Sequence, residues 1–203
     1  MRMRREWHKF SRCSSMSGDG IQHTDDLKTA LFIDGPNLHA TAKALGLDLD
    51  YSRMLGEFQK RGTILRAFYY IAISDDQEQF SHLRPLLDWL EYNGFTVVTK
   101  PTREYLDASG RRKLKGSMVV ELAVNAMSLA SQLDEMVLFT GDGDFRRLVE
   151  SVQRRGVRVT VVSTTATQPA MIAGELRRQA DVFIDLMELG ERVTRSNPVR
   201  AVR

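Results

Sequence analysis

The chain has one cysteine and no long apolar run, and each scarcity excludes a class of protein. Cys13 stands alone among 203 residues, so neither an intrachain disulfide nor a multi-thiolate zinc site can form. No apolar stretch approaches the roughly 18 residues of a membrane span. The basic N-terminus is not followed by the apolar core of a secretory signal. We therefore expect a cytoplasmic protein that does not associate with a membrane.

The composition that is present is that of an ordinary globular domain. Hydrophobic residues make up 42% of the chain and charged residues 27%, which suits one domain with a single buried core. The net charge of +3 and the pI of about 9.1 tilt the chain slightly toward polyanionic partners. Patterning predicts a flexible basic extension at residues 1–28, a domain at 29–192 and a loose tail at 193–203.

Apolar runs of β type alternate with amphipathic helical stretches from residue 30 onward. The expected strands are 30–33, 64–73, 95–99, 136–140, 157–163 and 180–185. The expected helices are 36–46, 50–60, 77–93, 117–132, 144–154 and 169–178. Residues 100–116 interrupt the alternation, and we expect a hairpin that turns at 107–110. The alternation predicts an α/β fold with a mainly parallel sheet covered by helices on both faces.

Two acidic clusters follow apolar strands about a hundred residues apart. Asp34 comes directly after the first strand, and Asp142 and Asp144 follow the strand at 136–140. Ligands gather outside the carboxyl ends of parallel strands, so these three side chains are expected to converge. Clustered carboxylates repel unless a cation lies between them, and oxygen ligands suit Mg²⁺ or Mn²⁺. The alternative is that Asp34 and Asp144 cap the helices that follow them.

The helix expected at 117–132 carries a polar stripe that begins with Glu121 and Asn125. At 3.6 residues per turn these residues share one face of the helix. That face is either exposed to solvent or, at its N-terminal part, directed toward the acidic site. Lys115 stands just before the helix. It is therefore placed to touch a phosphate, because the N-terminal end of a helix is positive.

The segment 100–116 is strongly basic, with six cationic residues against two acidic ones. Arg111, Arg112 and Lys113 form its densest run. Beside an acidic site such a segment is a candidate binding surface for the nucleic-acid backbone. A merely solvated charge run is the other interpretation.

These motifs together resemble the NYN domain family, in particular its LabA-like branch, which is related to the PIN-domain nucleases. The resemblance covers about residues 30–190 and rests on FIDGPNL at 32–38, KG with ELAV at 115–124 and LFTGDGDF at 138–145. It implies a three-layer α/β/α sandwich with a mainly parallel central sheet, an acidic pocket at the strand ends and Mg²⁺- or Mn²⁺-dependent cleavage of RNA. Matched by position, the family's acidic site comprises Asp34, Asn37, Asp142 and Asp144.

One motif departs from the family pattern. Ser117, Val119 and Asn125 replace an Asn and two Asp of the usual family sequence. Position 119 corresponds to an acid that related nucleases use near the start of this helix, and valine cannot ligate a metal. Glu121 remains as a candidate ligand, although helical geometry places it about 200° around the axis from position 119.

The sequence therefore predicts a divalent-metal-dependent ribonuclease acting on RNA, with single-stranded RNA expected because no element for reading a groove is evident. The predicted catalytic residues are Asp34, Asp142 and Asp144, the predicted metal ligands are these three with Glu121, and the predicted RNA contacts are Asn37, Arg111, Arg112, Lys113 and Lys115. Two alternatives stay open. One is a degenerate NYN domain that binds RNA or protein without cutting, and the other is a phosphatase or nucleotide hydrolase. A homodimer is also compatible with the sequence.

Overall fold

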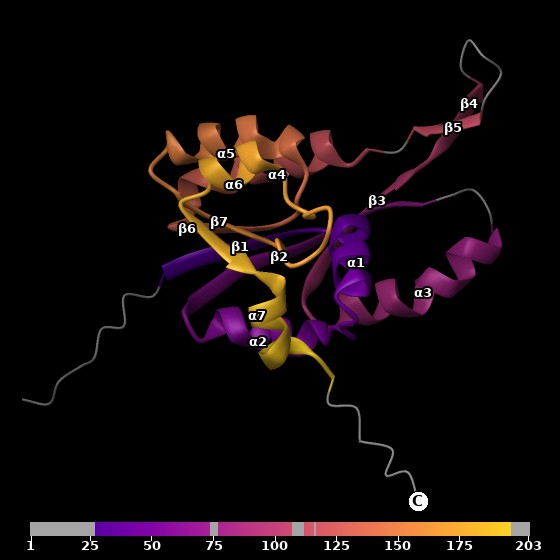
Figure 1. Cartoon of the computed structure of the whole chain (residues 1–203), viewed down its shortest axis with the longest axis horizontal. Coiled ribbons are helices and arrows are strands. Elements are labelled where there is room, and N and C mark those ends of the chain that lie inside the picture. The colour runs from indigo at the N-terminus through magenta and orange to yellow at the C-terminus, as the bar shows by residue number, and fades with distance from the viewer. Residues whose placement is uncertain (1–26, 74–76, 107–111, 116, 196–203) are drawn as a thin grey trace, which may run out of the picture.

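A six-stranded parallel sheet forms the centre of the structure, a computed structural model that describes residues 27–73, 77–106, 112–115 and 117–195. The strand order is β3-β2-β1-β6-β7-β8, and each neighbouring pair is parallel. The strands are β1 Leu27–Asp34, β2 Gly62–Ile73, β3 Phe95–Pro101, β6 Glu135–Phe139, β7 Arg158–Ser163 and β8 Val182–Asp185. Figure 1 shows helices above and below this sheet.

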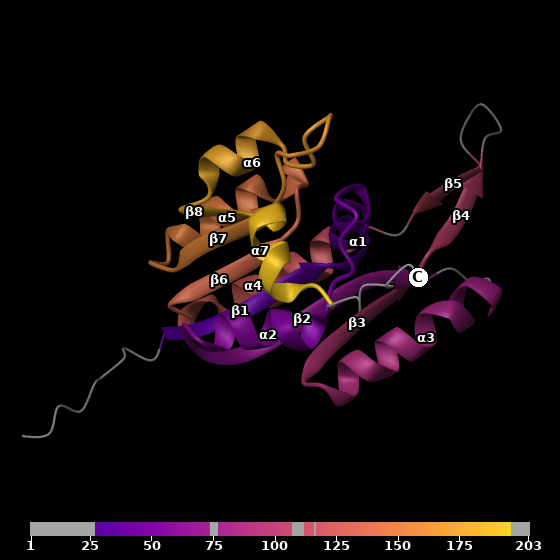
Figure 2. The same ribbon diagram turned by 60° about the horizontal axis from the view of Figure 1, so that its bottom comes forward.

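Helices cover both faces of the sheet, which confirms the predicted α/β/α sandwich (Figures 1 and 2). One face carries α1 Gly35–Ala44, α2 Tyr51–Gln59, α3 Gln77–Tyr92 and α7 Leu186–Val193. The other carries α4 Val119–Leu129, α5 Arg146–Gln153 and α6 Gly174–Gln179, with the short 3₁₀ helices η1 Ala130–Gln132 and η2 Gly143–Phe145. None of the described helices is long and apolar enough to cross a membrane.

Strand β1 is the central element because β2 and β6 flank it on both sides. Its residues Leu31 and Ile33 belong to the core on the α1 face, while Ala30 and Phe32 belong to the core on the α4 face, and all four are fully buried. The strand order reverses between β1 and β6, since β1 leads outward to β2 and β3 while β6 leads to β7 and β8. Such a switch point is where open α/β sheets bind ligands.

The predicted helix at 169–178 begins only at Gly174, because residues 164–173 form a loop tied to the sheet edge. In that loop Met171 N–H donates to the carbonyl of Thr164 at 3.1 Å, and Ala173 N–H donates to that of Gly141 at 2.9 Å. Helix α7 was not predicted. It starts at a cap in which the Asp185 carboxylate accepts from Met187 N–H at 3.0 Å.

The ends of the domain differ slightly from the predicted boundaries. Strand β1 starts at Leu27, two residues before the predicted domain start. Thr194 pairs with Leu49 in an isolated bridge, and Arg195 N–H donates to the carbonyl of Asp48. The predicted loose tail therefore does not include Thr194 and Arg195. Residues 1–26 and 196–203 lie outside the described structure.

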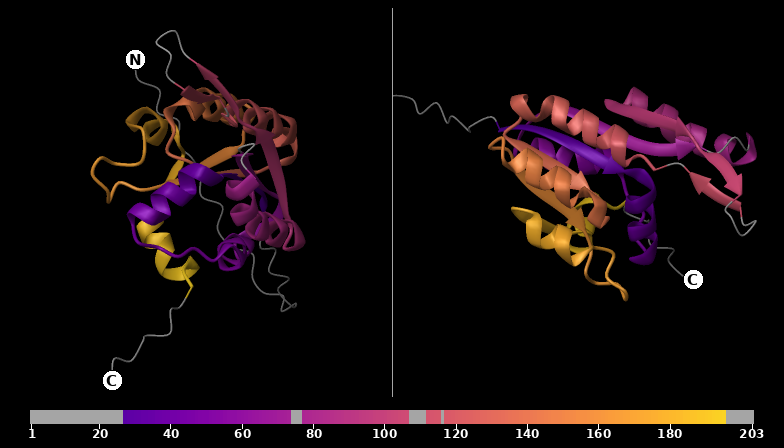
Figure 3. Two further views of the ribbon diagram at one scale, coloured as in Figure 1. Left: turned by 90° about the vertical axis from the view of Figure 1, so that its right-hand side faces the viewer. Right: turned by 90° about the horizontal axis from the view of Figure 1, so that it is seen from above.

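The predicted hairpin is present as an antiparallel pair of strands, β4 Arg103–Leu106 and β5 Arg112–Lys115. The pair continues from β3 and extends beyond the body of the sheet, on the side where α1 lies (Figures 1 and 3). The predicted turn at 107–110 lies outside the described residues.

Candidate functional site

The two acidic clusters meet at the switch point between β1 and β6. The two strands pair in parallel with Ile33 opposite Phe139, so Asp34 and Thr140 leave the sheet side by side. Asp34 ends β1 and precedes α1, and Asp142 precedes η2. The predicted meeting of these two motifs at one sheet edge is what the fold produces.

Asp34 is a half-buried carboxylate with two partners. Its Oδ2 accepts a hydrogen bond from Thr140 Oγ1 at 3.0 Å, and its Oδ1 accepts from Asn37 N–H at 3.5 Å as the N-cap of α1. Burial raises the pKa of Asp34 above its usual value, the two hydrogen bonds oppose that rise, and the negative charge of Asp142 adds to it. Asp34 is therefore a capping residue and also a carboxylate whose ionised form is disfavoured by burial and by Asp142.

Thr140 links the Asp34 carboxylate to the backbone of the turn after β6, a role that the sequence did not reveal. Besides its bond to Asp34, its Oγ1 accepts from Asp142 N–H at 3.3 Å. Asn37 acts in a similar way from α1, because its Oδ1 accepts from Gly141 N–H at 3.0 Å. Asn37 thus fixes the turn after β6, while its predicted contact with RNA stays a prediction.

Asp142 lies beside Asp34 in a pocket of about 210 Å³. One of its oxygens, Oδ1, caps η2 by accepting from Asp144 N–H at 3.0 Å. The remaining lining comes from both sides of the acidic pair and comprises Pro36, Ala72, Ser117, Met118, Val119, Leu122 and Phe145. The N-terminal end of α4 therefore faces the two carboxylates, but with Met118, Val119 and Leu122 and not with the polar stripe of Glu121 and Asn125.

The other two predicted ligands lie elsewhere. Asp144 is exposed and lines a separate groove on the far side of the turn. Glu121 forms an ion pair with Lys100, with 2.7 Å between Oε1 and Nζ, and this pairing lowers its pKa. Within the described residues no three His, Cys, Asp or Glu side chains are grouped to hold a metal ion. The expected convergence of three or four carboxylates is not found among the described residues, where Asp34 and Asp142 share a pocket and Glu121 pairs with Lys100. Asp144 as a metal ligand stays a prediction.

The acidic pair nevertheless fits a hard divalent cation. Mg²⁺ is commonly held by one or two carboxylates, with waters and substrate oxygens completing its shell. Asp34 and Asp142 supply two carboxylates that repel each other in one pocket. The donor set and the raised pKa of Asp34 are both those expected of a site that a cation would stabilise.

Two departures from the family motif have different positions in the fold. Val119 lines the acidic pocket, so the carboxylate absent at this position is absent from the site itself. Asn125 lies further along α4, where its Nδ2 donates to the hydroxyl of buried Tyr70 at 3.1 Å. The change at 119 therefore alters the wall of the acidic pocket, whereas Asn125 supports the packing of α4 on the sheet.

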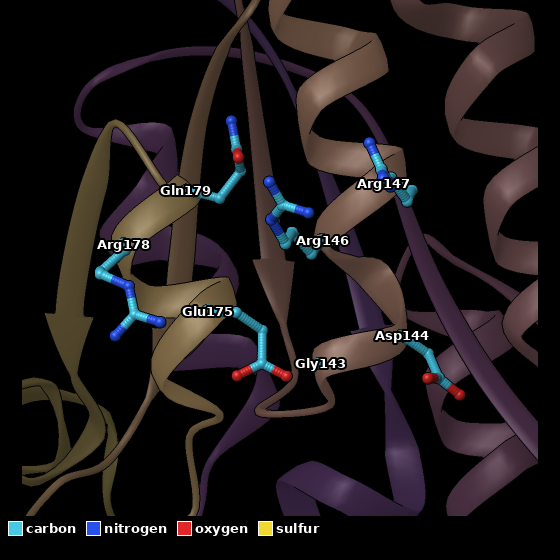
Figure 4. Close-up of a pocket in the computed structure, with 7 residues that line it drawn as sticks. All are labelled: Gly143, Asp144, Arg146, Arg147, Glu175, Arg178 and Gln179. Carbon is cyan, nitrogen blue, oxygen red and sulfur yellow. The ribbon is translucent and has the colours of Figure 1, made fainter.

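The predicted RNA contacts of the basic segment are only partly placed. Arg111 lies outside the described residues, and Arg112, Lys113 and Lys115 are described only as members of β5. The structure instead shows arginines that the sequence did not single out. Arg146, Arg147 and Arg178 line the groove next to the acidic turn (Figure 4). The Asp144-Phe-Arg-Arg run was the one signal that could have found two of them.

Comparisons with known proteins agree with this geometry. The NYN domain family model matches residues 28–188. The low amplitude and bright protein LabA of Synechococcus elongatus is 35% identical over 166 residues, covering 80% of this chain and 85% of that protein. A solved structure of a protein of unknown function from Vibrio parahaemolyticus is 27% identical to this chain, with a TM-score of 0.65. The match covers 84% of this chain and 96% of the Vibrio chain. The family is related to PIN-like nucleases, which generally use divalent metal ions. The chain therefore belongs to the NYN domain family, in its LabA-like branch.

Proposed function

We propose that the chain is a divalent-metal-dependent ribonuclease that hydrolyses single-stranded RNA beside Asp34 and Asp142. The observation that carries the proposal is the meeting of these two carboxylates in one pocket at the switch point of an NYN domain. The raised pKa of Asp34 supports it, since active sites are where burial and like charges perturb carboxylates.

In this proposal each described residue has one task. Asp34 and Asp142 hold Mg²⁺ or Mn²⁺, which when bound neutralises charge on the phosphodiester. Thr140 orients the Asp34 carboxylate through its hydroxyl and holds the backbone N–H of Asp142, and Asn37 keeps the turn after β6 against α1. Lys115, at the end of β5 and shortly before α4, is proposed to contact the RNA strand.

A binding module without catalysis is the second candidate, and Val119 is the observation that favours it. With valine at the pocket wall the site offers two carboxylates where related nucleases have more. Fewer charged ligands weaken binding of a divalent ion. The chain is therefore proposed to be a slow nuclease with low metal affinity, or in this second case an RNA-binding domain alone.

Cleavage of labelled single-stranded RNA in the presence of Mn²⁺ tests the proposal. We expect slow cleavage by the natural chain and a loss of at least about 100-fold in Asp142→Asn, because the ion then loses half of its carboxylate ligands. Val119→Asp should add a ligand and accelerate cleavage roughly tenfold at limiting metal. Val120→Asp is the matched control, since Val120 is 66% exposed and does not line the pocket.

The outcomes separate the two candidates. RNA left intact by the natural chain and by Val119→Asp, at the level of Asp142→Asn, would remove the nuclease proposal. Salt-sensitive RNA binding that needs no metal, with no turnover in any variant, would establish the binding module instead.

A further inference from the structure

A groove lined by arginines lies next to the acidic pair. It occupies about 640 Å³ between the η2 turn, the first turn of α5 and helix α6. Its lining comprises Gly143, Asp144, Arg146, Arg147, Glu175, Arg178 and Gln179. In Figure 4, Arg146 and Gln179 reach into the space between α5 and α6, while Asp144 turns away from them.

Two of the three arginines form no ion pair within the described part of the chain. Arg147 pairs with Glu150, with 2.9 Å between Nη1 and Oε2. Among the described residues, Arg146 and Arg178 form no ion pair within 4 Å, although the charge of Arg146 contributes to the lowered pKa of Glu150. A guanidinium presents a planar fork of donors that matches the oxygens of a phosphate. Two such groups facing one open groove form a site suited to phosphates.

The side chains that line the groove suit the phosphate backbone of a nucleic acid better than its bases. No aromatic side chain lines the groove among the described residues, so the stacking platform that single-stranded binders use to hold bases is missing there. The carboxylate of Glu175 lies over the turn, where a side chain on Gly143 would meet its Oε1. Glu175 weakens the attraction for phosphate, and Asp144, the other acid of the lining, turns away from the arginines (Figure 4), so three arginines stand against two acids in the groove.

The groove and the acidic pocket are two sides of one short turn. Asp142 and Phe145 line the pocket, while Gly143, Asp144 and Arg146 line the groove. The turn is fixed at both ends, by the Asp142 cap on Asp144 N–H and by the bond from Ala173 N–H to the Gly141 carbonyl. A strand that crosses this turn passes directly from the arginines to the carboxylates.

We propose that the groove between α5 and α6 binds the phosphate backbone of the RNA strand on one side of the bond that is cleaved at Asp34 and Asp142. The inference rests on the proposed function and adds where the substrate lies. It also predicts binding that is independent of base sequence, because backbone contacts carry no sequence information.

Binding of fluorescent single-stranded RNA to the full chain carrying Asp142→Asn, so that no cleavage intervenes, tests the inference. Adding Arg146→Gln and Arg178→Gln should weaken binding on the order of tenfold, as expected for one half-buried and one exposed charged group. The slope of log affinity against log salt should fall by roughly 0.7 for each phosphate that the protein no longer neutralises. Glu175→Gln removes the opposing charge and should instead strengthen binding severalfold.

The matched control removes two positive charges from the opposite face of the sheet. Lys60 of the α2 C-terminus and Arg84 of α3 are exposed and paired with Glu57 and Asp88, so Lys60→Gln with Arg84→Gln should leave RNA affinity nearly unchanged. Equal losses of affinity in the control and the groove variant would overturn the inference and indicate net charge alone. Unchanged binding in both the arginine variant and Glu175→Gln would also overturn it, even where cleavage supports the nuclease proposal. Glu175→Gln keeps the test decisive if the arginine variant unfolds.

Discussion

Asp34 carries two roles that conflict at the scale of a single residue. As the N-cap of α1 and the acceptor of the Thr140 hydroxyl it supports the fold. As a half-buried anion near Asp142 it costs stability, which is what its raised pKa expresses. A residue retained at such a cost is typical of sites selected for ligand binding rather than for stability.

Asp34→Asn is therefore expected to stabilise the metal-free protein near neutral pH, by about 0.5–2 kcal/mol. The pKa of Asp34 is raised in the folded state, so the penalty is present where the carboxylate is ionised in both states. It is relieved as pH falls through the raised pKa and vanishes below the unfolded value of about 3.9. Denaturant unfolding of both proteins between pH 7 and pH 3 should show the difference closing on acidification.

Added Mn²⁺ supplies the control for that measurement. It should raise the unfolding temperature of the natural chain more than that of Asp34→Asn, because only a ligand bound to the folded state stabilises it. The expectation is contradicted if Asp34→Asn is less stable than the natural chain at pH 7 and if Mn²⁺ raises both unfolding temperatures equally. Asp34 would then serve the fold as a helix cap and not as a metal ligand.

Residue patterns in the sequence located the acidic pair but not the residues that hydrogen-bond to it. Asp34 and Asp142 were predictable neighbours, since both follow parallel strands and the carboxyl ends of such strands share one edge. Thr140 is a polar residue at the end of an apolar run, and nothing in one sequence distinguishes it from a turn residue. Glu121 was grouped with the site by motif, yet the helical period turns it toward Lys100.

At the scale of elements, the turn after β6 depends on a close backbone approach at Gly141. A Cβ at this position would collide with the carbonyl oxygen of Met171 in the loop 164–173. That loop is anchored on its other side by Asp185, which accepts hydrogen bonds from Thr164 and Thr165. The acidic turn is therefore positioned by a loop far away in sequence.

Gly141→Ala should destabilise the protein by about 2–4 kcal/mol, because either the turn or the loop must move. Gly56→Ala in α2 is the matched control, since its Cβ would meet no atom within 4 Å. That control should stabilise the protein by roughly 0.5–1 kcal/mol, as alanine does in a helix interior. Chemical unfolding of the two variants gives the comparison, and equal effects would show that the close approach at Gly141 is unimportant.

The loop 164–173 also shows why one helix was predicted with the wrong start. Strands and long helices followed from apolar periods, and all six predicted strands are present in the sheet. The stretch 169–178 has helical composition throughout, but its first half is held by hydrogen bonds to Thr164 and Gly141 instead. Tertiary contacts of this kind override local propensity and leave no periodic trace.

At the scale of the whole molecule, the acidic pair lies between a hairpin of basic sequence and the arginine groove. The sheet order places β3, from which the hairpin extends, at one edge and β8 at the other, with β1 and β6 between them. The hairpin projects beyond the carboxyl ends of the strands (Figure 3), and the arginine groove lies on the far side of the η2 turn. Charge arranged in this way suits a chain that crosses the whole edge of the sheet.

This arrangement predicts that RNA length decides which charges matter. An oligonucleotide of about 4 residues should respond to Arg146→Gln with Arg178→Gln but not to neutralisation of Arg111, Arg112 and Lys113, because it is too short to span both regions. One of about 16 residues should respond to both sets, with nearly additive reductions in binding free energy, since the two sets belong to separate elements of the fold. Titrations at several salt concentrations measure the affinities, and their slopes report how many phosphates the protein neutralises. If the long RNA ignored the hairpin set, the basic segment would be merely solvated charge, and the groove alone would hold the strand.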